Sequence, residues 1–189
     1  MASARLTFGD GRFQHSAFSF PGLGQLVFDL YPLPPRLYES RLNGRYPRRM
    51  YQPDRPPFVI DHPLGATMLV RADVAESTQG FDESFHMYCE EIDWSWRVRE
   101  SGWEIYSVPK AEIVHYGGES TRQIPAQSLL NLWASRAQLY RKHHGPLKQW
   151  VAAWLVRSKM SRQARQAQDP QLKSAYERIV ALWSPNSQH

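Results

Sequence analysis

The sequence contains a single cysteine, Cys89, among its 189 residues. One thiol excludes an internal disulfide and a zinc site built from cysteines, and it is typical of a reducing compartment. The chain also lacks an apolar run of the roughly 20 residues that a spanning helix needs. Its longest C-terminal apolar run covers residues 150–156, and its first eleven residues hold no hydrophobic core of a signal peptide. We therefore expect a cytoplasmic protein.

Acidic residues are scarce in the C-terminal region. Residues 136–189 contain ten Lys or Arg and two acids, whereas residues 76–104 contain eight acids and two arginines. The net charge of +5 thus hides an acidic centre and a basic C-terminal region. A hydrophobic content of 42%, with 13% aromatic residues, is enough for a packed core and argues against disorder.

The acidic centre holds three carboxylates, Glu90, Glu91 and Asp93, within four residues. Like charges this close disfavour full ionisation, so the cluster is a general-base site, a cation site or a solvated helix face. We expect a helix over residues 87–99, ended near Gly102. On that helix Glu90 and Asp93 share a face with Arg97, and Glu91 points to another side.

Hydrophobic patterning predicts strands at residues 58–60, 65–70, 103–108 and 111–116, the last two separated by Pro109-Lys110. Residues 26–31 suit a short strand or a buried loop, and Asp73 can cap a short helix through Ser77. Three helices are expected after residue 124, the second and third opening at Pro146 and Asp169-Pro170. The apolar face expected on the second is Leu147, Trp150, Val151, Trp154 and Leu155.

Residues 32–57 contain seven of the fourteen prolines and six arginines. Proline removes backbone donors and breaks helices, so this composition cannot sustain a helix or a central strand. A basic loop of this length inside a compact domain is usually a lid, a binding loop or a poorly ordered insertion.

Several collinear motifs resemble the C-terminal half of glycosyltransferase family two, most closely its rhamnosyltransferase-like branch. The resemblance runs from about residue 9 to about residue 150. Its motifs are residues 65–71, 80–85 and 88–94, followed by Arg97, Gly102-Trp103, Val108-Pro109, Val114-His115, Gly117-Gly118 and Ser120.

The resemblance implies a GT-A fold, a nucleotide-sugar donor, a divalent cation and inversion at the anomeric carbon. By position it makes Glu91 the general base, a glutamate where the family usually has aspartate, with Glu90 and Asp93 in support. It places His115 in the shell of a Mg²⁺ or Mn²⁺ ion. The substrate-binding residues that it implies are Gly65, Ala66, Trp94, Trp96, Gly118 and Ser120.

Enzymes of this family begin with a Rossmann-like half that ends in an Asp-x-Asp cation motif, and this chain resembles only the half that comes after that motif. Glu91-Ile92-Asp93 has the carboxylate spacing of that motif, but it lies in the expected helix and is therefore not the missing motif. We therefore expect a partial GT-A α/β domain over residues 1–123, a basic helical region over residues 124–189, and an N-terminal half that this chain lacks.

Each of these assignments has an alternative. Trp94 and Trp96 either stack on an acceptor sugar or belong to the core. Asp93 either takes part in catalysis or, as the alternative, anchors Arg97. His115 is a metal ligand or an exposed strand-end residue. The basic helix 146–165 lies on an anionic membrane surface, at its cytoplasmic face, or packs on the domain.

Two functions are consistent with the sequence. The first is an inverting glycosyltransferase fragment acting on a cell-surface polysaccharide or glycolipid acceptor, and the second is an inactive half-domain that binds a partner or a membrane. Nucleic acid is not an expected partner, because no recognised nucleic-acid-binding motif accompanies the basic charge.

Overall fold

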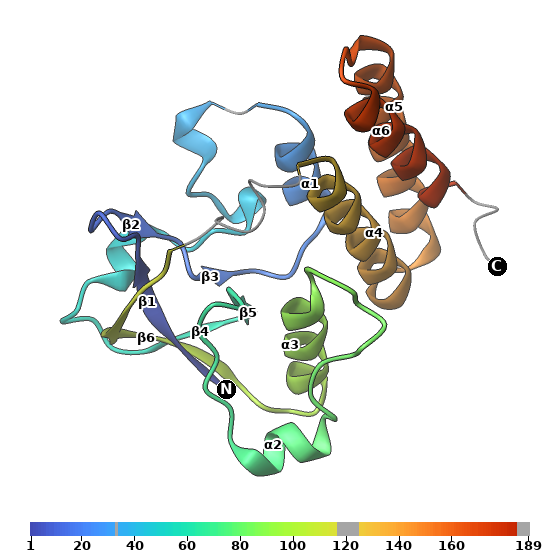
Figure 1. Ribbon diagram of the computed structural model, residues 1–189. Helices are drawn as coiled ribbons and strands as arrows, with labels where there is room; N and C mark the ends of the chain where they lie inside the picture. Colours follow the sequence, from blue (N-terminus) through green and yellow to red (C-terminus); the bar gives the residue numbers. More distant parts are fainter. Residues whose placement is uncertain (33, 117–124, 185–189) are drawn as a thin grey trace. The chain divides into compact units, whose positions relative to one another are not determined.

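The computed structural model describes residues 1–32, 34–116 and 125–184 (Figure 1). It is a mixed α/β structure, as the sequence predicts, and its chain forms two compact units. The first unit consists of Met1–Phe28, Pro32–Glu83 and Glu90–Gly117, and the second of Asp29–Tyr31, Ser84–Cys89 and Gly118–His189.

The first unit is built on a four-stranded mixed sheet with the order β2-β1-β6-β4 (Figure 1). The strands are β1 (Ala2–Thr7), β2 (Phe13–Gln14), β4 (Phe58–Ile60) and β6 (Ile105–Val114). The two central strands β1 and β6 are parallel, and β2 and β4 run antiparallel at the edges. A second, two-stranded sheet pairs β3 (Ala17–Phe18) with β5 (His62–Pro63).

The two strands expected on either side of Pro109-Lys110 form the single strand β6. Its pairing with β1 shifts register at this point, because Ala4 lies opposite Val108 and Arg5 lies opposite Glu112. Proline has no N–H to donate to a ladder, and a bulge is where a sheet tolerates it. The irregularity therefore accommodates Pro109 without ending the strand.

Two other sequence predictions in this unit are wrong. The expected buried strand at residues 65–70 is irregular, and only Leu69 forms an antiparallel bridge, with Ala2. Its side chain is 76% exposed, so an apolar run here did not mean burial. The segment expected as a strand or loop at residues 26–31 belongs mostly to helix α1 (Leu23–Leu30).

Helix α3 (Glu90–Glu100) begins three residues later than its sequence pattern predicts. Tyr88 and Cys89 have φ values of 69° and 67°, in the left-handed region of backbone geometry. A right-handed helix cannot include such residues, so it begins only after Cys89. Each such non-glycine residue costs roughly 1 kcal/mol, so tertiary packing must hold this turn. The short helix α2 (Ala72–Ser77) has no side-chain cap, since Asp73 pairs with Arg71 instead.

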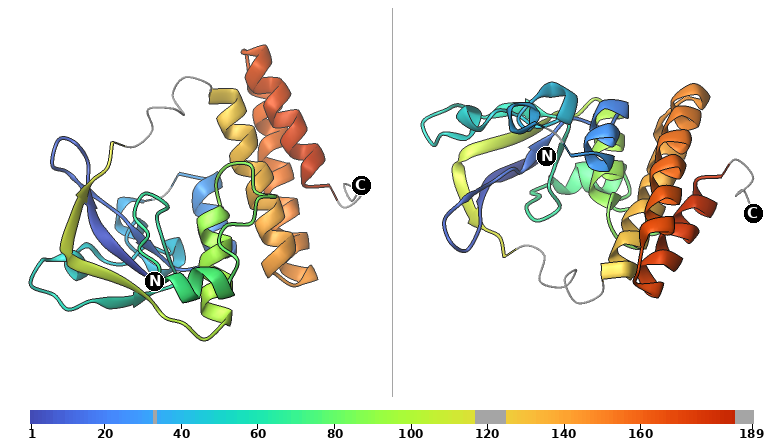
Figure 2. Two further views of the ribbon diagram at one scale, coloured as in Figure 1. Left: turned by 60° about the horizontal axis from the view of Figure 1, so that its bottom comes forward. Right: turned by 90° about the horizontal axis from the view of Figure 1, so that it is seen from above.

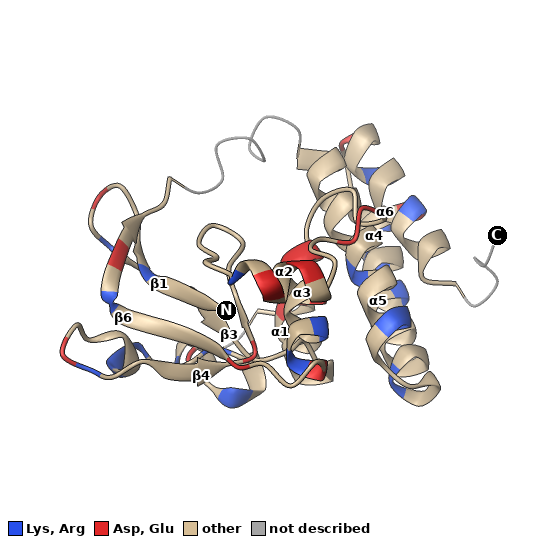
Figure 3. Ribbon diagram, turned by 90° about the horizontal axis from the view of Figure 1, so that it is seen from below, with Lys and Arg blue, Asp and Glu red and all other residues tan. Residues whose placement is uncertain are grey.

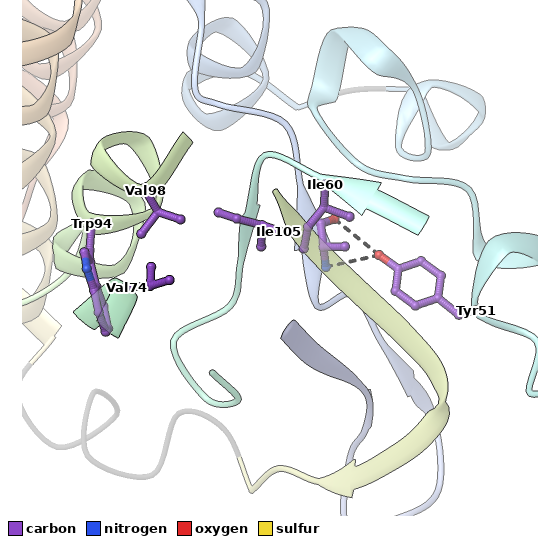
Figure 4. Close-up of a cluster of buried hydrophobic side chains, with 7 residues drawn as sticks. Tyr51, Ile60, Val74, Trp94, Val98 and Ile105 are labelled. Atoms are coloured by element: carbon purple, nitrogen blue, oxygen red, sulfur yellow. Dashed lines mark hydrogen bonds between the residues drawn. The ribbon is translucent and has the colours of Figure 1, made fainter. Parts of the chain in front are cut away.

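The core of the first unit lies between its sheet and helices α2 and α3 (Figure 4). Its buried side chains are Ala17, Tyr51, Ile60, Val74, Trp94, Val98 and Ile105. The Tyr51 hydroxyl donates to the Ala17 carbonyl at 3.2 Å and accepts from the Ala17 N–H at 3.1 Å. This pair of bonds ties the segment 32–57 to strand β3.

The segment 32–57 contains neither an α-helix nor a strand among its described residues, as its proline content predicts. It is nevertheless structured by three short 3₁₀ helices, Pro35–Leu37, Arg41–Asn43 and Arg48–Tyr51.

The second unit contains helices α4 (Pro125–His143), α5 (Pro146–Gln166) and α6 (Pro170–Leu182), which pack against one another (Figure 2). All three open with proline in the first turn, as expected, and Asp169 caps α6 by accepting from the N–H groups of Gln171 and Leu172. Within the described residues no helix is both long and apolar enough to span a membrane.

The apolar face expected on α5 is not the buried face. Ala152, Val156, Met160 and Ala164 are buried, whereas the larger Leu147, Trp150 and Trp154 are exposed. Small residues allow close helix packing, which explains why the alanine-containing face is the inner one.

Helix α3 is anchored by Asp93, whose side chain is fully buried and pairs with Arg97 at 2.9 Å. The Arg97 guanidinium also donates to the carbonyl of Thr78 and, at 2.6 Å, to the carbonyl of Gly80. Arg97 therefore joins the buried carboxylate of α3 to the turn that follows α2.

Replacing Arg97 with leucine leaves the Asp93 carboxylate buried without its counter-charge. We expect Arg97→Leu to lower the free energy of unfolding by about 3 kcal/mol, measured by urea denaturation. Arg99→Leu, on the same helix, is the matched control and should cost less than about 1 kcal/mol. Similar losses for both variants would contradict the anchoring role.

Candidate functional site

Glu91 lies in the first turn of α3 and is partly exposed, and Gly65 and Ala66 are exposed. A Cβ atom placed on Gly65 would lie 3.6 Å from Cβ and Cγ of Glu91 and 3.7 Å from its Cδ. Any side chain at position 65 would therefore touch the Glu91 side chain. The Oε2 atom of Glu91 is shielded from solvent. The structure thus brings together Glu91 and Gly65, two of the residues that the sequence predicts.

The neighbouring acids have different surroundings. Asp93 is fully buried and pairs with Arg97. This is the anchoring role that the sequence analysis gives as its alternative to a catalytic role. Glu90 is partly buried, and its Oε2 atom is shielded from solvent without a hydrogen-bond partner. The acidic cluster is therefore one structural carboxylate and two partly accessible ones, rather than a single solvated face.

The two tryptophans of α3 differ in their exposure to solvent. Trp94 is 7% exposed, and its Nε1–H donates to the Thr78 hydroxyl at 2.7 Å, so it belongs to the core and is not available to stack on a sugar. Trp96 is partly exposed and stacks on Phe20, with 4.1 Å between ring centroids. Phe20 in turn donates its N–H to Asp61 Oδ2 at 3.0 Å.

Sequence reasoning did not find this aromatic stack, because Phe20 and Trp96 lie far apart in the chain. His62 extends it, with its ring stacked 6.2 Å from Phe20 and 5.4 Å from Phe18. An exposed aromatic face is a surface on which the C–H groups of a sugar can pack.

His115 follows directly after β6 and is partly exposed. Its backbone N–H donates to the Thr7 carbonyl at 2.8 Å, and its Nδ1 lies 3.0 Å from the Gln14 side-chain oxygen. Since that oxygen only accepts, Nδ1 carries a proton in this contact. Gln14, which sequence reasoning missed, orients this ring.

The described residues bring no group of three or more His, Cys, Asp or Glu side chains together in a form that could hold a metal ion. His115 alone does not form a cation site, and a bound ion would need ligands from a substrate or from other residues. The expected Mg²⁺ or Mn²⁺ stays a prediction. The predicted contacts Gly118 and Ser120 lie outside the described residues.

His62 in β5 is buried, and burial lowers its pKa to about 4, although a hydrogen bond to the Pro63 carbonyl and the charge of Asp61 oppose the shift. Its Nδ1–H donates to that carbonyl at 3.0 Å. The imidazole beneath the Phe18 and Phe20 rings is therefore neutral at pH 7.

Comparison with known proteins finds sequence similarity to sugar-transferring enzymes. Over 122 residues the chain is 32% identical to N-acetylglucosaminyl-diphospho-decaprenol L-rhamnosyltransferase from two strains of Mycobacterium tuberculosis. Over 64 residues it is 36% identical to the rhamnosyltransferase WbbL of Escherichia coli K12. The chain resembles rhamnosyltransferases over part of its length.

The extent of these matches is limited. The mycobacterial match covers 64% of this chain and 38% of the relative, and the WbbL match covers 34% of this chain and 24% of that protein. The chain therefore spans well under half the length of the curated relatives it matches. No family model matches the chain. No solved structure matches it either.

The burial of neutral His62 predicts a pH-dependent stability. Its pKa is about 4 in the folded chain and roughly 6.5 when unfolded, so the unfolded state binds more protons between these values. The free energy of unfolding should fall by roughly 3 kcal/mol as pH drops from about 6.5 to about 4.

The change is measured by urea denaturation at a series of pH values. His62→Phe, which keeps an aromatic ring against Phe18, should flatten the dependence in this window, and His86→Phe at an exposed position should leave it in place. An unchanged slope in His62→Phe would contradict the assignment.

Proposed function

We propose that this chain carries the acceptor-side part of an inverting glycosyltransferase, with Glu91 as its general base. The similarity to rhamnosyltransferases supports the transferase class. The approach of Gly65 to the Glu91 side chain supports the assignment of the base, because a glycine there places no side chain of its own between that carboxylate and an attacking hydroxyl.

In the proposed reaction Glu91 takes the proton of an acceptor hydroxyl while the hydroxyl oxygen attacks the anomeric carbon of the donor sugar. The new glycosidic bond forms as the bond to the nucleotide diphosphate breaks, and the electron pair leaves with the diphosphate. The carboxylate must reach within about 2.6–3.2 Å of the hydroxyl oxygen. The partly exposed Trp96, backed by Phe20, would offer a ring for the acceptor sugar.

The names of the relatives suggest the substrates. The mycobacterial relative is named for an N-acetylglucosaminyl-diphospho-decaprenol acceptor and for rhamnosyl transfer. We therefore propose a nucleotide-activated rhamnose or similar hexose as the donor and a glycan or polyprenyl-diphosphate-linked sugar as the acceptor. A divalent cation, with His115 as one ligand, would offset negative charge on the donor diphosphate.

Glu91→Gln removes the proposed base at nearly constant size. Since the chain matches less than half of its relatives, turnover is measured for the chain alone and for a chimera that joins it to the part of the mycobacterial protein that it does not match. The substrates are nucleotide-activated rhamnose and a prenyl-diphosphate-linked N-acetylglucosamine. We expect Glu91→Gln to lower turnover at least about 100-fold.

Glu100→Gln, at the exposed end of the same helix, is the control and should leave turnover within about twofold. Full turnover in Glu91→Gln would exclude Glu91 as the base. Absence of turnover in both the unmutated chain and the chimera would instead favour the inactive half-domain.

We further propose that α5 contacts an anionic membrane surface. Leu147, Trp150 and Trp154 recur at spacings of three and four residues and are 75%, 65% and 59% exposed. The helix carries five Lys or Arg and no acid (Figure 3). Tryptophan favours the lipid interface, and cations contact lipid phosphates, so such a helix suits the surface of a bilayer.

The double variant Trp150→Ser, Trp154→Ser removes the exposed rings without opening the core. We expect at least tenfold weaker binding to vesicles containing 30% phosphatidylglycerol, measured by flotation, because the inserted aromatic area is lost. The double variant Tyr116→Ser, Leu69→Ser, at exposed apolar positions of the first unit, is the control. Equal vesicle binding by the α5 variant would contradict a membrane role.

A further inference from the structure

An arginine-lined cavity of about 530 Å³ lies within the first unit, in the segment 32–57. Arg41, Arg45 and Arg49 line it together with Glu39, Tyr46 and Ser19. Its lining includes neither Glu91 nor His115.

The loop that carries these arginines has a fixed backbone. The Ser40 hydroxyl accepts from the Asn43 N–H, and the buried Asn43 donates its side-chain amide to the Tyr38 carbonyl at 2.7 Å. Gly44 follows with a φ of 64°, which favours glycine, and its carbonyl accepts from the Ser19 N–H at 2.8 Å. Arg41 and Arg45 therefore stand on a preorganised turn, and Arg49 lies in the 3₁₀ helix Arg48–Tyr51.

Arg45 is the most constrained of the three. Its guanidinium lies 4.1 Å from the centroid of the Tyr38 ring and 6.0 Å from that of Phe18. Its Nε–H is shielded from solvent and has no hydrogen-bond acceptor. A buried donor without an acceptor is costly, so a ligand that supplies oxygen atoms would be stabilised here.

The positive charge of the cavity is only partly neutralised by its own lining, which holds three arginines and one acid. Glu39, which is the acid among the lining residues, accepts from the Arg48 N–H at 3.0 Å and lies 3.5 Å from His15 Nε2. Among the described residues, none of the three arginines forms an ion pair with a carboxylate. Planar guanidinium groups bind phosphate oxygens in a bidentate manner, and three of them match a doubly charged anion.

We propose that this cavity binds the diphosphate group of a substrate. The proposal deepens the proposed function and rests on it for the identity of that substrate. Both a lipid-linked acceptor and a nucleotide-sugar donor carry a diphosphate, so the chemistry that the cavity recognises is shared by the two.

Binding is measured by calorimetry on the full chain, with inorganic pyrophosphate as the first probe. We expect saturable binding, and a dissociation constant at least tenfold larger for Arg45→Gln than for the unmutated chain. Arg45→Lys keeps the charge but loses the planar group on Tyr38, so it should give an intermediate loss. The matched control is Arg55→Gln, in the same basic segment but outside the cavity lining, with less than a twofold change.

The source of the diphosphate is distinguished with a nucleoside diphosphate and a short prenyl diphosphate as further probes. Tighter binding of one of them than of pyrophosphate supports the proposal and assigns the site to that substrate. Equal losses in Arg45→Gln and Arg55→Gln, absence of saturable binding, or weaker binding of both larger probes would overturn it. Thermal unfolding of each variant checks that the fold is retained.

These measurements involve no turnover. If pyrophosphate does not bind, the role of Glu91 is still decided by its own turnover measurement. Conversely, a chain without measurable turnover can still bind pyrophosphate through Arg45.

Discussion

The buried ion pair between Asp93 and Arg97 is the interaction on which the first unit depends. A carboxylate that is fully removed from water is stable only with a counter-charge, and Arg97 supplies it while donating to the carbonyls of Thr78 and Gly80. This arrangement fixes the rotation of α3 about its axis. Because Glu91 lies two residues before Asp93, the same anchor directs the Glu91 side chain toward Gly65 and away from the core.

Local signals predicted local structure well. Proline in the first turn and apolar spacing identified α4, α5 and α6, and the spacing of Asp93 and Arg97 identified their ion pair. What failed depended on distant partners: the exposure of Leu69, the continuity of β6 through Pro109, and the burial of the alanine face of α5. No window of sequence contains the surface against which such residues pack.

In the candidate site, too, local sequence identified residues but not the distant residues that they contact. The sequence singled out Glu91, Gly65 and Trp96, but their roles come from contacts across long separations, such as the ring of Phe20 on Trp96 and the approach of Gly65 to Glu91. The segment 32–57 illustrates a further limit. Its composition excluded regular elements, yet it could not show that Ser40, Asn43 and Gly44 would fix the backbone around a cavity lined by arginines.

The parallel pairing at the centre of the main sheet sets the order in which the first unit can fold. Ala2 pairs with Tyr106 and Thr7 with Val114, so during synthesis the earliest strand of this unit must wait for its latest one. Until then β1 lacks its central partner and is open to association with other chains. Such a non-local closure is slow compared with helix formation, so α4 to α6, which come later in the sequence, can emerge while the sheet is still assembling.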